Sequence, residues 1–113
     1  MEHIIDASGQ VVGRLASKIS LILQGKMASS YEPHRPGVDR VIVKNASRLV
    51  VSGRKTERKI YYHHTGYMGH LREKSYRQAF ASSPEKVLYD AVFNMLPKNF
   101  IRQKRLNRLK IER

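Results

Sequence analysis

The sequence of 113 residues contains no cysteine and no tryptophan, and only 8% of its residues are aromatic. Without cysteine, neither a disulfide framework nor a thiolate metal site can form. The low aromatic content makes a large buried ligand pocket hard to build in so short a chain. No apolar run approaches the roughly 18 residues of a membrane-spanning helix, and charged Glu2 directly follows Met1, where a secretory leader would continue into an apolar stretch. We therefore expect a soluble, intracellular protein.

Acidic residues are also scarce. Asp and Glu total nine against 22 Lys and Arg, which gives a net charge of +13 and an isoelectric point near 10.4. The charge is spread along the chain, with a net +5 in residues 1–56 (nine basic, four acidic) and +8 in residues 57–113 (13 basic, five acidic). Such a positive field favours binding to a polyanion. Nucleic acid is the leading partner predicted, and an anionic membrane surface is the alternative.

The pattern of apolar residues predicts a small α/β protein. Short apolar or β-branched runs indicate strands at 3–6, 40–44, 49–51 and 59–62. Helical spacing predicts a helix from Gly13 to Gly25. A second helix is predicted to begin at Ser83-Pro84-Glu85 and to end before Pro97, with helices dominating after residue 62. We find no repeat or linker, so the sequence predicts one domain, 1–113, with helices packed on a central sheet and a basic C-terminal segment at about 98–113.

The densest group of side chains suited to RNA is the heptad Tyr61-Tyr62-His63-His64-Thr65-Gly66-Tyr67. Tyr and His can stack on unpaired bases and bond to phosphate or the 2′-hydroxyl, and glycine lets backbone approach closely. Alternation along a strand predicts that one of the first two tyrosines faces the core. The RNA contacts predicted in this region are His63, His64, Thr65, Gly66, Tyr67, Gly69, Arg72 and Lys74.

The adjacent histidines also raise the possibility of an enzyme. Neighbouring side chains on a strand point to opposite faces, so His63 and His64 cannot easily share one metal. The chain has no H-E-x-x-H or deaminase motif. A nucleotide-directed enzyme with a heptad histidine as general base would need Glu57 or Glu73 nearby. We predict no enzyme activity, no metal, no cofactor and no small-molecule substrate, and the enzyme stays the alternative hypothesis.

Other basic and loop residues are candidates for contact with phosphate. Gly9 and Gly13 lack the spacing of a phosphate loop and predict a turn before a helix, from which Arg14 can reach RNA. Pro97 forms a rigid corner that presents Lys98. The basic closing segment favours backbone–phosphate binding over a membrane surface. The further contacts predicted are Arg14, Lys26, Ser52, Gly53, Lys55, Pro97, Lys98, Arg102, Lys104, Arg105 and Arg108.

At several points the sequence resembles one known family, the universal L-thirteen family of large-subunit ribosomal proteins. The matching motifs, in chain order, are Asp6-Ala7-Ser8-Gly9 with Gly13-Arg14-Leu15-Ala16-Ser17, Tyr31-Glu32-Pro33-His34, Asn45-Ala46, Val51-Ser52-Gly53 with Lys55, the heptad, Met95-Leu96-Pro97-Lys98 and Arg108-Leu109-Lys110-Ile111. Matches of this number in the same order on a basic chain are specific. Family members usually carry residues beyond both ends of this match, so contacts made by those residues are not transferred.

The resemblance implies a three-layer α/β/α fold with a central, mostly parallel four-stranded sheet. It also implies a structural role in the large ribosomal subunit, with large-subunit rRNA and neighbouring ribosomal proteins as partners, binding early in assembly, and RNA contacts in the first loop at Tyr31 and His34. No independent homo-oligomer is expected. The implied location is the cytoplasm within the large subunit. An organellar ribosome and a second role on messenger RNA remain open.

Overall fold

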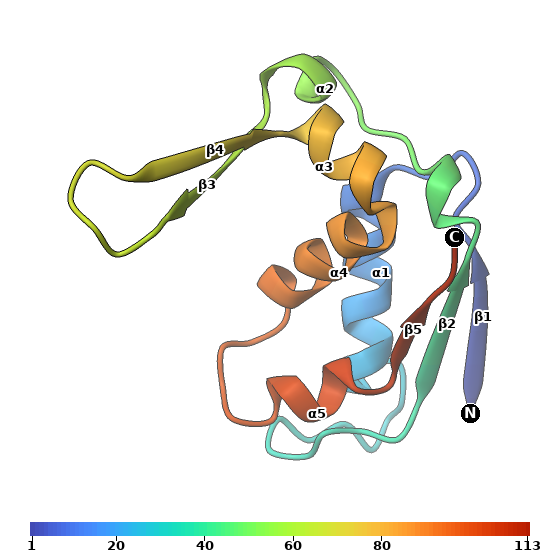
Figure 1. Cartoon of the computed structure of the whole chain (residues 1–113). Coiled ribbons are helices and arrows are strands. Elements are labelled where there is room, and N and C mark those ends of the chain that lie inside the picture. The colour runs from blue at the N-terminus through green and yellow to red at the C-terminus, as the bar shows by residue number, and fades with distance from the viewer.

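The computed structural model describes residues 1–113, and its larger sheet has three parallel strands (Figure 1). These are β1 (Glu2–Asp6), β2 (Arg40–Lys44) and β5 (Leu109–Ile111), in the order β1-β2-β5. Ile4 pairs with Ile42 and Val43 with Ile111. The β-branched run of β2 lies in the centre, as its composition predicts for a buried parallel strand.

Helix α1 (Val12–Gln24) forms because its apolar residues recur at helical spacing, and Leu15, Ile19 and Leu23 are fully buried. The helix ends where Gly25 adopts a left-handed φ of 79°, which glycine reaches without strain. Its amide donates to the carbonyl of Ile22, so the C-terminus is closed. The predicted helix and its end at Gly25 are confirmed.

Helix α4 (Pro84–Met95) begins and ends where the sequence predicts. Pro84 occupies the first turn and Ser83 precedes it, although the Ser83 hydroxyl bonds to the Glu85 carboxylate at 3.2 Å and does not cap the helix. Helix α1 packs against both β2 and α4, and their buried side chains form most of one hydrophobic cluster. The remaining helical elements are short: η1 (Ala46–Arg48), α2 (Lys55–Arg58), α3 (Tyr76–Ser82) and α5 (Arg102–Leu106).

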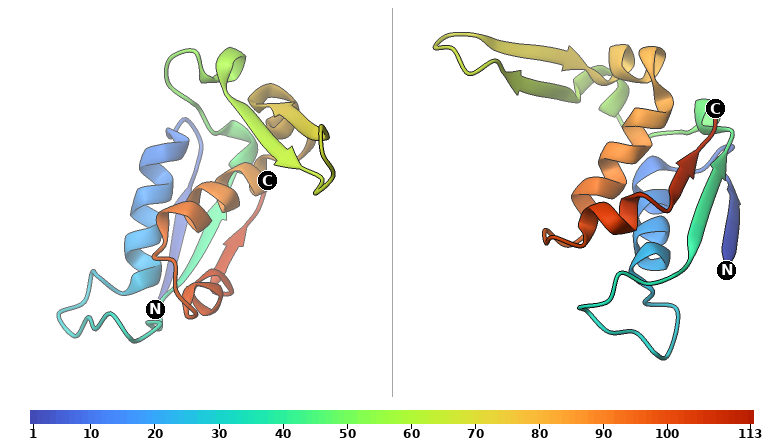
Figure 2. Two further views of the ribbon diagram at one scale, coloured as in Figure 1. Left: turned by 90° about the vertical axis from the view of Figure 1, so that its left-hand side faces the viewer. Right: turned by 60° about the horizontal axis from the view of Figure 1, so that its bottom comes forward.

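The expected four-stranded, three-layer arrangement requires correction. The predicted strand at 49–51 is reduced to one parallel bridge between Val11 and Val50, because the 3₁₀ turn η1 comes directly before it. Helices α1, α4 and α5 all lie on the same side of the sheet (Figures 1 and 2). On the other face Ile4 is 65% exposed. The structure therefore has a three-stranded sheet covered by helices on one face.

The other two strands form a separate antiparallel hairpin, β3 (Ile60–His64) and β4 (Leu71–Ser75). The strand predicted at 59–62 is present but extends to His64, and it joins the hairpin and not the central sheet. Its partner β4 was not predicted, because its sequence, LREKS, lacks the apolar alternation of a strand. The base of the hairpin lies beside α2 and α3 at the top of the molecule in Figure 1, and its tip projects away from the body (Figures 1 and 2).

Candidate nucleic-acid interface

The projecting hairpin carries almost all of the heptad. Its two strands pair only with each other, and nearly every side chain from Tyr62 to Lys74 is exposed. Tyr67 is 74% exposed and Met68 97% exposed at the tip. A two-stranded hairpin without a packed face has marginal stability by itself in water. Large apolar side chains held out on such a hairpin are typical of a surface that binds a partner.

The hairpin tip is ordered by its own hydrogen bonds. Thr65 donates through its backbone amide and its hydroxyl to the His70 carbonyl, both at 3.2 Å. Gly66 and Gly69 adopt left-handed φ angles of 90° and 77°, which explains why the turn uses glycine. The Gly66 amide donates to Nδ1 of His64 at 3.0 Å. In a neutral imidazole the proton then sits on Nε2, which makes His64 an outward hydrogen-bond donor.

The base of the hairpin is attached to the core through Tyr61. This side chain is half-buried against the core cluster, and Lys59 Nζ lies 5.3 Å from its ring centroid. Burial raises the pKa of Tyr61, and the negative charge of Asp90 raises it further. Tyr62, its neighbour, is 61% exposed. The prediction that one of the two tyrosines faces the core is confirmed, and Tyr61 is the one.

The cations of the hairpin are free of acidic partners. Cross-strand pairing places Arg72 opposite His63 and Lys74 opposite Tyr61. Neither cation forms a salt bridge, and Lys74 donates only to the Ser82 hydroxyl at 3.1 Å. Their charges therefore remain available to an anionic ligand.

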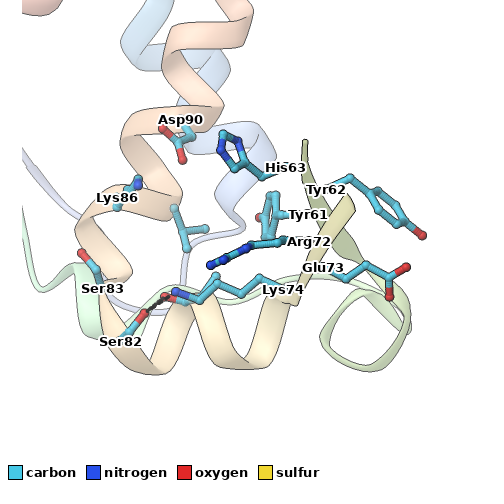
Figure 3. Close-up of a pocket in the computed structure, with 12 residues that line it drawn as sticks. Tyr61, Tyr62, His63, Arg72, Glu73, Lys74, Ser82, Ser83, Lys86 and Asp90 are labelled. Carbon is cyan, nitrogen blue, oxygen red and sulfur yellow. Dashed lines mark hydrogen bonds between the residues drawn. The ribbon is translucent and has the colours of Figure 1, made fainter. Parts of the chain in front are cut away.

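A groove of about 540 Å³ separates this face of the hairpin from helices α3 and α4. In Figure 3, Arg72 and Lys74 reach from β4 toward the helices, and the His63 ring points toward α4 at the level of Asp90. Lys86 adds a third cation from α4. Tyr62 and Glu73 point away from the helices. The groove thus combines three cations, aromatic rings and the carboxylates of Asp90 and, at its outer edge, Glu73.

Sequence reasoning missed the helical wall of this groove. Ser83 precedes Lys86 and Val87 by three and four residues, and Asp90 follows them by four and three, which places these residues on one face at the start of α4. That spacing was visible in the sequence. What it could not reveal was that the hairpin lies opposite this face.

A second group of predicted contacts lies at the other end of the molecule, in the loop of residues 26–39 and the residues around α5 (Figure 1). Lys26 Nζ lies 5.8 Å from the ring centroid of Tyr31. His34 is exposed, and its Nε2 lies 3.1 Å from the Glu32 carboxylate. The exposed residues Pro97, Lys98 and Lys104 belong to the same end. Arg102 is half-buried, with its guanidinium 3.7 Å from the Phe93 ring centroid.

Two predicted phosphate contacts in this region have a different role. Arg105 is only 1% exposed and donates to the carbonyls of Pro33 and Arg35, at 3.4 and 3.0 Å. The half-buried Arg108 donates to the carbonyls of Asp39, at 2.6 Å, Leu23, at 2.9 Å, and Pro36. Burial lowers the pKa of Arg108, and the nearby charge of Arg105 lowers it further. Both guanidiniums tie the 26–39 loop to the body, so the structure assigns them a structural role.

The remaining predicted contacts lie near the hairpin end. Arg14 is exposed near the start of α1, and Ser52, Gly53 and Lys55 are exposed on the segment that leads into α2. The predicted set therefore divides between two ends of the molecule and does not form one continuous site.

Neither of the two carboxylates predicted to assist a heptad histidine lies on the His63 face of the hairpin, where Asp90 is the nearby acid. Glu73 shares a face of the hairpin with Tyr62, opposite to His63, and Glu57 lies in α2. No cluster of three or more His, Asp or Glu side chains is placed to hold a metal ion. None of the helices combines the length and apolar character needed to cross a membrane.

Comparison with known proteins agrees with this description. The family model described as "Ribosomal protein L13" matches residues 1–112. Large ribosomal subunit protein uL13 of Chloroflexus aggregans is 49% identical over 109 residues, which cover 96% of this chain and 76% of the relative. The uL13 proteins of Clostridioides difficile (44%, covering 76% of that protein) and Thermotoga maritima (46%, covering 73%) match over the same length. The chain therefore belongs to the ribosomal protein L13 family.

Proposed function

We propose that this chain binds and stabilises large-subunit rRNA through two basic regions at opposite ends of the fold, and that it does so early in subunit assembly. Membership of the family makes the chain a structural ribosomal protein of the large subunit and not an enzyme. We further propose which surfaces of the chain contact RNA. Residues 1–113 are proposed to act as one functional domain.

The observation that carries the proposal is the hairpin. It holds exposed tyrosine and histidine rings, two cations without acidic partners and a tip ordered by its own hydrogen bonds. Aromatic rings beside cations suit unpaired bases and phosphates. An ordered tip loses little conformational entropy on binding. These properties favour insertion of the hairpin between RNA segments.

The second region is the end formed by the 26–39 loop and the residues around α5. Its solvent-facing cations suit contact with the phosphate backbone, which positions a protein without reading sequence. The residues that we propose as RNA contacts, over both regions, are Arg14, Lys26, Tyr31, His34, Ser52, Gly53, Lys55, His63, His64, Thr65, Gly66, Tyr67, Gly69, Arg72, Lys74, Pro97, Lys98, Arg102 and Lys104. Arg105 and Arg108 are left out, because their guanidiniums are used inside the fold.

The net charge of +13 makes electrostatics the main source of affinity in this proposal. We expect the affinity for protein-free large-subunit rRNA to fall steeply with salt, with a log–log slope of about −0.7 to −0.9 for each phosphate neutralised. A titration of the purified protein at several salt concentrations measures this slope. A slope near zero would contradict the proposal.

Early assembly requires that the protein recognise rRNA before most other proteins are present. Binding to protein-free rRNA, with retention through a moderate salt wash, is the expected result. If binding appeared only after other large-subunit proteins had been added, the early role would fail while rRNA binding stood. We further propose neighbouring large-subunit proteins as partners, no independent homo-oligomer and a cytoplasmic location within the large subunit.

A further inference from the structure

The groove between the hairpin and helices α3 and α4 differs from the exposed tip. It is bounded on two sides by different parts of the chain, and its volume of about 540 Å³ lies in the range of small-ligand sites, roughly 300–1,000 Å³. Three cations line it, Arg72 and Lys74 from β4 and Lys86 from α4. None of the three forms a salt bridge.

The two ends of the groove have different chemistry. Lys74 bonds to Ser82 at one end, and Figure 3 shows Arg72 reaching toward the same part of the groove. At the other end the His63 ring lies at the level of Asp90, with the Tyr61 ring beside β4. Cations bind a phosphate through charge-assisted hydrogen bonds. Aromatic rings stack on a base, and a carboxylate accepts hydrogen bonds from the amino groups of the base. A bare phosphate would leave the ring end unused and would be repelled by Asp90.

We propose that this groove holds one RNA nucleotide turned out of its stack, with the phosphate at Arg72, Lys74 and Lys86 and the base against Tyr61 and His63. The inference rests on the proposed binding of rRNA and names what this part of the surface takes. Asp90 accepts a hydrogen bond from a base amino group or from the 2′-hydroxyl. The hairpin and α4 then contact the nucleotide from two sides. These contacts also fix the orientation of the hairpin relative to the rest of the fold.

The first test removes a cation from the helical wall. Lys86→Ala is compared with Lys18→Ala, which removes the same charge from an exposed position of α1 that does not line the groove. Both are titrated with protein-free large-subunit rRNA at one salt concentration, and circular dichroism checks the fold. We expect Lys86→Ala to weaken binding about tenfold and Lys18→Ala at most about twofold. Equal effects of the two substitutions would overturn the proposal.

The second test fills the groove without changing its charge. Ser82→Trp places a large ring in the space, and Ser82→Ala removes the same hydroxyl but leaves the groove open. We expect about a tenfold loss of rRNA affinity for the first and at most about a twofold loss for the second, because the Trp ring occupies the end of the groove where the phosphate is placed, beside Lys74. If Lys86→Ala weakens binding and Ser82→Trp does not, the groove holds no nucleotide and the proposal is wrong.

Absence of rRNA binding and absence of a nucleotide in the groove give different results in these tests. If the unmodified chain binds no rRNA, both the proposed function and the groove proposal fail. If it binds, but Lys86→Ala and Ser82→Trp bind as tightly as their controls, only the groove proposal fails. Ultraviolet cross-linking with peptide identification gives an independent readout. We expect a nucleotide cross-link at Tyr61, and cross-links confined to Tyr67 at the hairpin tip would contradict the groove proposal.

Discussion

The hairpin and the closing segment are both rich in positive charge, but they use that charge differently. In the closing segment, Arg105 and Arg108 bind backbone carbonyls, while Lys110 and Arg113 pair with carboxylates of Glu112 and Glu85. In the hairpin, Arg72 and Lys74 are exposed along the groove and have no acidic partner. Density of basic residues in the sequence therefore does not identify the RNA-binding surface. The RNA-binding surface that we propose is chosen by whether each cation is already paired with an acceptor within the fold.

The largest effect expected from this comparison is the loss of Arg105. Arg105→Ala should lower the free energy of unfolding by about 3 kcal/mol, because two carbonyls of the 26–39 loop lose their donor and a cavity opens. Urea unfolding measures the change. The neighbouring exposed Lys104 provides the control, since Lys104→Ala should change stability by less than about 0.5 kcal/mol. Equal effects of the two substitutions would remove the distinction between satisfied and free cations.

A smaller effect is expected on rRNA binding when three exposed rings of the hairpin are removed. Replacing His63, His64 and Tyr67 together with Ala should weaken rRNA binding about 30-fold, which corresponds to about 2 kcal/mol, and change the free energy of unfolding by less than about 1 kcal/mol. Titration with rRNA and urea unfolding give the two values. Ile4→Ala shortens an exposed side chain outside both basic regions and should leave binding unchanged. Unchanged binding of the triple variant, with an intact fold, would move the site elsewhere.

The smallest effect concerns Asp6, an exposed carboxylate that accepts hydrogen bonds within the fold. The Asp6 carboxylate accepts hydrogen bonds from the Asn45 side chain and the Ser8 amide, both at 3.0 Å, and these bonds lower its pKa from 3.8 to about 2. Because the pKa is lower in the folded state, the stabilisation is complete above about pH 4 and is lost as the pH falls toward 2. The unfolding free energies of the wild type and Asp6→Asn should therefore converge as the pH falls from 4 to 2. A constant difference would contradict this assignment.

The sequence predicted those elements whose signals are local. Strand β2 has the bounds that its β-branched run indicated, and Gly25 and Pro84 mark the end of α1 and the start of α4. Strand β5 was missed because its three residues lie in a basic segment and become a strand only by pairing with β2. The polar strand β4 likewise depends on its partner β3.

The sequence likewise predicted only part of the candidate site. The heptad was identified from its composition, and the division between Tyr61 and Tyr62 followed from strand alternation. Lys104 and Arg105 are adjacent and chemically similar, yet one is exposed and the other buried. Arg105 follows the buried Ile101 by four residues, which places it on the inner face of α5, and this spacing was the available signal. The groove could not be predicted, because it depends on how the hairpin sits against α4.

The salt dependence of rRNA binding tests the central claim most directly when it is measured for two matched double variants. Arg72→Gln with Lys74→Gln removes two free cations of the hairpin, and Lys110→Gln with Arg113→Gln removes two that are paired with carboxylates. We predict that the first pair reduces the magnitude of the log–log slope by about 1.4 to 1.8 and that the second leaves it nearly unchanged. Equal reductions by both pairs, or an unchanged slope for the hairpin pair, would contradict the account.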